Sequence, residues 1–137
     1  MVERLTVADV VNGLIRTVSD RGYSSFVVRT NRIDRAFAAA YGRLLHLAPT
    51  YGLDVRFRIA LDDAGKSRTF RDALNAASQR DLVSFDNPEY QDMRVDHSKV
   101  SMTVSYDRLP GDASLYEQLA EAFLQEYEGP DRELAAS

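Results

Sequence analysis

The tripeptide Gly65-Lys66-Ser67 is the stretch whose residue types come closest to known chemistry, that of a phosphate-binding P-loop. In a P-loop the lysine and the hydroxyl bind phosphate and magnesium, and a glycine five positions before the second one lets backbone amides curl around the phosphate. Ala60 holds that earlier position here, and Asp62 and Asp63 would place carboxylates beside the phosphate oxygens. The sequence therefore predicts an ordinary strand-to-helix turn, followed by a helix that Ser67 or Thr69 caps.

Four arginines at alternating positions of predicted strands form a second candidate site, a ligand or partner surface. They are Arg29, Arg56, Arg58 and Arg94. On one face of a sheet they would bind a nucleic acid or another anionic ligand through its phosphates. The same alternation places Asp54, Asp62, Asp92, Asp96 and Asp107 on that face, and no aromatic side chain on which a base could stack. We therefore expect cross-strand ion pairs first, a protein-protein surface second and an anionic ligand third.

The acidic segment 86–99 is a third candidate, as a divalent-metal site. It contains Asp86, Glu89, Asp92 and Asp96, followed by His97 and Lys99. Metal-dependent nucleases combine carboxylates and a lysine on adjacent strands around the ion. The spacing from Asp96 to Lys99 misses that arrangement by one position, which on a strand is the opposite face. We expect no metal and no cofactor, and we keep a metal-dependent hydrolase or nuclease as the second alternative function.

The remaining residue types predict no catalytic residue. The absence of cysteine excludes disulfides, thiolate zinc sites and cysteine nucleophiles. Of the two histidines, His46 lies on the predicted outer face of a helix and His97 lies in a predicted hairpin turn. The chain has no glycine-rich dinucleotide fingerprint and no Gly-x-Ser-x-Gly motif. A protein that is not an enzyme is therefore the favoured class.

Four segments with helical periodicity would position these residues. Each begins with a side-chain acceptor that is followed three residues later by a carboxylate, a signature of helix starts. The pairs are Thr6/Asp9, Asn31/Asp34, Thr69/Asp72 and Ser114/Glu117. The helices are expected to stop at Gly22, before Pro49, near Asp81 and at Gly129-Pro130.

Alternating runs between the helices predict strands, at residues 24–30, 53–61, 82–85, 92–96 and 99–107. The order is then α-β-α-β-α-β-β-β-α. Because apolar residues alternate with polar ones, one face of the sheet is expected to be polar. The predicted fold class is α/β (mixed, α+β-like), with one mixed sheet of about four to five strands and four helices mainly on one face. Residues 1–129 would form a single globular domain, and residues 130–137 a short polar C-terminal tail.

Composition favours a soluble, cytoplasmic protein with no membrane association. The 137 residues suit one domain, and no apolar run approaches the roughly 18 residues that span a bilayer. The net charge is −4, but residues 1–58 hold nine arginines and five acids, whereas residues 59–137 hold eight basic and sixteen acidic residues. Such halves neutralise each other on folding or in head-to-tail association.

The last predicted helix offers a candidate dimer surface because its apolar arc is wider than the stripe that packing against one neighbouring element needs. Leu115, Tyr116, Leu124 and Tyr127 belong to that arc. Such a helix either packs deep in its own domain or shares its stripe with a second subunit. The sequence thus favours a non-enzymatic binding or regulatory module that acts through protein-protein association, with a homodimer as the expected form.

Overall fold

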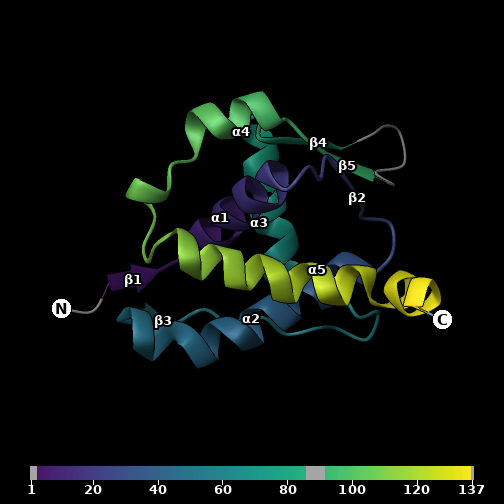
Figure 1. The fold of residues 1–137 in the computed structure, drawn as a ribbon, viewed down its shortest axis with the longest axis horizontal. Coiled ribbons are helices and arrows are strands. Elements are labelled where there is room, and N and C mark those ends of the chain that lie inside the picture. The colour runs from purple at the N-terminus through teal and green to yellow at the C-terminus, as the bar shows by residue number, and fades with distance from the viewer. Residues whose placement is uncertain (1–2, 86–91, 137) are drawn as a thin grey trace.

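The computed structural model describes residues 3–85 and 92–136, with side chains up to residue 129 (Figure 1). The elements are β1 (Glu3–Leu5), α1 (Val7–Asp20), β2 (Ser25–Val27), α2 (Arg32–Tyr51), β3 (Leu53–Val55), α3 (Arg68–Gln79), β4 (Val83–Phe85), β5 (Asp92–Val95), α4 (His97–Thr103), the 3-10 helix η1 (Tyr106–Arg108) and α5 (Ala113–Ala136). The predicted mixture of helices and strands is confirmed at the level of class. In the described part of the chain, no helix is both long and apolar enough to cross a membrane.

Two small sheets replace the single mixed sheet of four to five strands, so that prediction is wrong. β1 and β3 form a parallel pair, and β2, β5 and β4 form an antiparallel sheet in that order. The two sheets lie at opposite ends of the molecule, with helices between them (Figure 1). β2 and β3 lie in different sheets because β2 pairs with β5, whereas the predicted strand 53–61 pairs with β1 and only over β3.

The predicted last strand, 99–107, is helical instead over residues 99–103 and 106–107. The Asp96 side chain accepts a hydrogen bond from the Lys99 amide at 3.0 Å and caps α4, so His97 begins a helix and does not lie in a hairpin turn. Val100 and Val104 are both buried, whereas Met102 between them is 86% exposed. Residues four positions apart lie on one face of a helix and also on one face of a strand, so the two valines fit either structure. Only Met102 distinguishes the two structures, because a strand would place it on the same face as the valines.

The core lies between α5 and the helices α1 and α2, on which α5 packs. α2 continues through Pro49 to Tyr51 and ends where Gly52 adopts a left-handed conformation, with φ of 64°. α5 continues past Gly129 and Pro130 to Ala136. The predicted helix ends at both prolines are therefore wrong. A proline removes one amide donor but does not by itself fix where a packed helix ends.

Candidate interaction site

The Gly65-Lys66-Ser67 sequence forms a turn, as predicted, and each residue has a structural role in it. Asp62 accepts hydrogen bonds at Oδ1 from the amides of Ala64 and Lys66, both at 2.9 Å. Gly65 has φ of 78°, and a β-carbon there would lie 2.4 Å from Nδ2 of Asn31. A carboxylate therefore takes up amides that would bind phosphate in a P-loop, and the glycine serves the turn and the close approach to α2.

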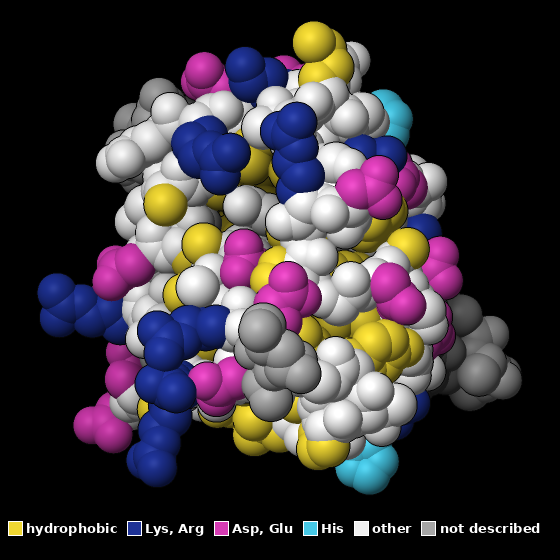
Figure 2. Space-filling view, turned by 90° about the vertical axis from the view of Figure 1, so that its left-hand side faces the viewer, with side chains coloured by type: hydrophobic (Ala, Val, Ile, Leu, Met, Phe, Trp, Pro, Cys, Tyr) yellow, Lys and Arg dark blue, Asp and Glu magenta, His cyan; other side chains and the backbone are white. Residues whose placement is uncertain are grey.

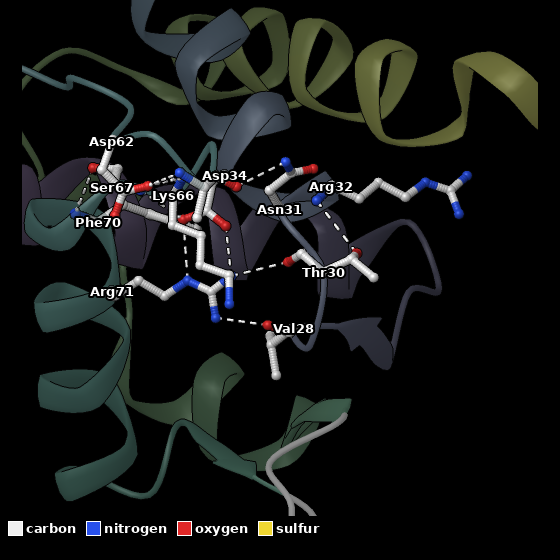
Figure 3. Close-up of polar contacts among 11 residues, drawn as sticks. Val28, Thr30, Asn31, Arg32, Asp34, Asp62, Lys66, Ser67, Phe70 and Arg71 are labelled. Atoms are coloured by element: carbon white, nitrogen blue, oxygen red, sulfur yellow. Dashed lines mark hydrogen bonds and ion pairs between the residues drawn. The ribbon is translucent and has the colours of Figure 1, made fainter.

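Ser67 connects this turn to α3 and to α2 (Figure 3). Its hydroxyl accepts a hydrogen bond from the Phe70 amide at 3.2 Å, which makes Ser67 the N-cap of α3. Its own amide donates to Oδ1 of Asp34 at 2.9 Å. Ser67 is completely buried, so its hydroxyl serves the helix cap and no bound nucleotide.

Asp34 and Arg71 form a buried ion pair that sequence reasoning missed. Arg71 donates from Nε to Oδ1 at 3.0 Å and from Nη2 to Oδ2 at 2.5 Å, and Asp34 is 0% exposed. The guanidinium also donates to the carbonyls of Val28 at 2.7 Å and Thr30 at 3.0 Å (Figure 3). The pair therefore fastens α3, the start of α2 and the loop before α2 to one another.

Neither hollow near the core is suited to a small ligand. A hollow of about 210 Å³ borders Arg71, Leu74 and Phe85, but the donors of Arg71 are already used by Asp34 and two carbonyls. A cavity of about 20 Å³ among apolar core side chains, including Phe37 and Phe70, has room for about one water molecule. Apolar cavities of that size stay dry, so this cavity has no room for a substrate.

Residues 56–61, here called the edge segment, continue the line of β3 beyond its pairing with β1. Arg56, Arg58 and Ala60 are exposed, whereas Phe57 and Ile59 are half-buried and pack against the core. Leu61, the next inward position, is 42% exposed. Alternation with a period of two indicates an extended conformation with one face on the core and one in solvent.

The edge segment is held at both ends and at one point between them. At its start β3 pairs with β1, and beyond its end the Ala64 carbonyl accepts a hydrogen bond from Nδ2 of Asn31 at 3.0 Å. Between these points the Tyr41 hydroxyl donates to the Phe57 carbonyl at 2.9 Å. The chain therefore runs back along α2 toward α3, as Figure 1 shows. This anchoring fixes the position of an extended backbone on the surface.

Beyond Arg56, whose amide belongs to the ladder between β3 and β1, the backbone amides of residues 57–61 have no hydrogen-bond acceptor among the described residues. The Gly52 carbonyl accepts from the Glu3 amide at 3.0 Å, so even-numbered residues of β3 turn their polar backbone groups toward β1. Leu53 and Val55 then turn their backbone N–H and C=O groups away from β1. By the same alternation, the amides of Phe57, Ile59 and Leu61 point to that outer side. A row of such groups is a sheet edge that can pair with another strand, and its Phe57 carbonyl, which accepts the Tyr41 hydroxyl, keeps one lone pair for that pairing.

The four predicted arginines do not share one sheet face. Arg56 and Arg58 lie on the edge segment, Arg94 lies on β5 of the other sheet, and Arg29 lies in the loop before α2. Instead of a cross-strand ladder, Arg56 pairs with Asp54 on its own strand at 2.7 Å. On the side of the molecule where β1 and β3 lie, Asp and Glu side chains lie among the Lys and Arg side chains (Figure 2).

A hollow of about 230 Å³ opens where β1 and the edge segment separate. Arg4, Thr6, Arg56 and Phe57 are among the residues that line it. The Asp54 carboxylate already neutralises Arg56, so this hollow provides Arg4 as its main positive group. Among the described residues that line it, the hollow therefore gathers little net positive charge for binding phosphate.

The residues predicted for a dimer surface lie in the chain's own core. Leu115, Tyr116 and Leu124 are buried, and the half-buried Tyr127 accepts a hydrogen bond at its hydroxyl from the Val27 amide at 2.8 Å. The Tyr116 hydroxyl donates to the Pro110 carbonyl at 2.7 Å, and burial raises the pKa of that phenol well above its usual value. The apolar arc of α5 is therefore occupied within the chain.

The predicted charge neutralisation between the two halves also occurs within the chain. Arg21, at the end of α1, forms an ion pair with Glu121 on α5 at 3.1 Å. A surface for self-association must therefore lie elsewhere than the α5 stripe.

The histidines and the acidic segment form no catalytic cluster in the described part of the chain. His46 is exposed, as predicted. Nδ1 of His97 lies 2.5 Å from Oγ of Ser19, but Ser19 is buried, so this contact fastens α4 to α1. Asp86 and Glu89 lie outside the described residues. Among those described, no three His, Asp or Glu side chains are close enough to hold a metal ion.

Comparison of the chain with protein-family models, with curated proteins and with solved structures finds no match. The basis for a functional proposal is therefore the geometry of the chain itself.

Proposed function

We propose that this protein is a non-enzymatic binding module that acts through protein-protein association, and that an extended strand of its partner docks on the edge segment. The observation that carries the proposal is the row of outward backbone amides at Phe57, Ile59 and Leu61, which find no acceptor in the described chain. Partner strands that add to such an edge gain affinity from main-chain hydrogen bonds and specificity from alternate side chains.

The anchoring of the edge segment supports this role. Its ends are fixed by the β1 pairing and by the Asn31 and Asp34 contacts with residues 64–67, so little backbone entropy remains to be lost when a partner binds. The exposed Arg56 and Arg58 would lie beside alternate side chains of the added strand. A partner with acidic or small polar residues at those positions fits this edge best.

Proline substitution at Ile59 is expected to weaken binding of an extended peptide at least about tenfold, because it removes an outward amide that the partner strand needs. The probe is a ten-residue peptide selected on this protein from a library with alternating apolar positions, and affinity is measured by fluorescence anisotropy. Ala60→Pro is the matched control, since the Ala60 amide turns to the other side and its loss should change affinity by less than about threefold.

Two results of this experiment would contradict the proposal. One is a selection that yields no peptide that binds the folded protein. The other is equal affinity for the Ile59→Pro variant and the unmodified chain, with both shown to be folded by circular dichroism. In either case the outward amides of the edge segment would not be a docking site.

A further inference from the structure

The edge segment is complementary to an antiparallel copy of itself. We infer that the strand that docks on it belongs to a second copy of this chain, in a two-fold arrangement with its axis at Ile59. This inference rests on the proposed function and names the partner of the same site. Its support is the order of charged, small and apolar residues along residues 56–62, together with the direction of the backbone groups.

The backbone limits the registers that two copies can adopt. Outward amides occur at odd-numbered residues, and in an antiparallel pair each must face an outward group of the other strand. Only registers that oppose odd to odd and even to even residues meet this condition. Such registers also place the half-buried side chains of both copies, such as Phe57 and Ile59, on one face of the paired strands. The exposed side chains of both copies, such as Arg56 and Arg58, then lie on the other face.

The register centred on Ile59 matches each opposed pair over residues 56–62, and beyond them Val55 meets Asp63. Ile59 faces Ile59 of the second copy, Phe57 faces Leu61, Arg58 faces Ala60 and Arg56 faces Asp62. Apolar residues thus meet apolar ones on the inner face. On the outer face an arginine meets a carboxylate, and the second arginine meets the smallest side chain of the segment. Each of these cross-strand pairs over residues 56–62 is favourable or neutral.

The neighbouring registers oppose unfavourable pairs. A register centred on Phe57 places Arg56 against Arg58, and one centred on Arg58 places Arg58 against itself. A register centred on Ala60 matches only residues 58–62 before Phe57 meets Asp63. Like charges opposed across strands are destabilising, and so is a carboxylate opposed to a ring on the inner face. The register centred on Ile59 therefore has the longest run of matched pairs.

Two side chains gain partners in that arrangement. Leu61 is one of the large apolar side chains that remain exposed in the described chain, at 42%, and Phe57 of the second copy would cover it. Asp62 uses Oδ1 for the amides of Ala64 and Lys66, and no described residue bonds to its Oδ2, which faces Arg56 of the second copy in this register. A pairing of about six residues is smaller than a standard stable interface, so the dimer is expected to be weak and to depend on concentration.

The register can be tested by disulfide cross-linking because the natural chain has no cysteine. An equimolar mixture of Arg58→Cys and Ala60→Cys chains is expected to form the mixed disulfide dimer at least about tenfold faster than a mixture of Arg56→Cys and Ala60→Cys chains, since only the first pair is directly opposed. The second mixture corresponds to the register centred on Arg58. Equal rates in the two mixtures, under the same oxidant, would overturn the inferred register.

Sedimentation equilibrium of the unmodified chain tests the identity of the partner. The mass is expected to rise above 15.4 kDa toward twice that value as the concentration reaches the millimolar range, and Ile59→Pro is expected to remain at 15.4 kDa. A chain that stays at 15.4 kDa throughout would overturn the second copy as the partner, while the selected peptide would still bind if the proposed function holds. A dimer that forms equally in Ile59→Pro would also overturn the inference, because it would use another surface.

Discussion

Replacement of Arg71 with methionine is expected to lower the free energy of unfolding by about 3–5 kcal/mol. Asp34 is 0% exposed and takes two hydrogen bonds from Arg71, so the variant would leave a carboxylate buried with only the Ser67 amide as a partner. The carbonyls of Val28 and Thr30 would lose their donor as well. Removal of one member of a buried ion pair is costly because the other charge remains desolvated.

Urea denaturation of three variants measures this effect. Arg68→Met, one turn away on the exposed side of α3, is the control and should change the free energy of unfolding by less than about 0.5 kcal/mol. Asp34→Leu combined with Arg71→Met should be less destabilised than the sum of the single changes, because neither charge is then left alone. A loss below about 1 kcal/mol for Arg71→Met would contradict the buried pair.

Alanine at Gly13 is expected to destabilise the protein by about 2 kcal/mol or more, although alanine is the better helix former by about 1 kcal/mol. A β-carbon on Gly13 would lie 2.2 Å from Cδ1 of Tyr116, a ring that is itself completely buried. The ring cannot move outward without losing its packing and the hydrogen bond from its hydroxyl to Pro110. The absence of a side chain at Gly13 therefore lets α5 approach α1.

Gly42 provides the matched control for this prediction. It lies in α2, and a β-carbon there would meet no atom within 4 Å. Gly42→Ala should therefore raise the melting temperature, whereas Gly13→Ala lowers it, and Tyr116→Leu should offset part of the loss at Gly13 by vacating the space. Equal shifts for Gly13→Ala and Gly42→Ala would show that the ring does not lie over Gly13.

The starts of the helices were largely predictable from sequence because capping is local. Thr6 and Asp9 form the predicted capping box. Of the two caps predicted for α3, Ser67 is the one that is used, whereas α5 begins earlier than predicted because Asp112 accepts the Leu115 amide in place of a cap at Ser114. In both cases two residues that lie two positions apart can cap, and the choice depends on tertiary contacts such as the bond from the Ser67 amide to Asp34.

The sheets were poorly predictable because their strands are only three or four residues long. β1 is too short to show a period and was missed. The run 53–61 has the alternation of a strand over its whole length, yet only β3 finds a partner in the described chain. Alternation indicates that one face of a segment is buried, but whether the segment pairs depends on which strand lies beside its edge.

The candidate site was predictable only in part for the same reason. Arg56 and Arg58 were identified from their alternation, but their position on an unpaired edge was not. Asp34 was assigned a capping role, and its partner Arg71 lies 37 residues further along the chain, so no local pattern joins them. A carboxylate three residues into a helix, on the side of its apolar stripe, is the signal that points to a buried partner.

Hydrogen exchange at the amides of Phe57, Ile59 and Leu61, followed by NMR, tests the proposed docking edge most directly. In dilute solution these amides should exchange nearly as fast as in an unfolded chain, while the amide of Leu44 in the α2 core stays protected. Addition of the selected peptide, or concentration of the chain into the millimolar range, should slow exchange at these outward amides and leave Leu44 unchanged. Strong protection of the Ile59 amide already in dilute monomer would contradict the account, because the edge would then be satisfied within the chain.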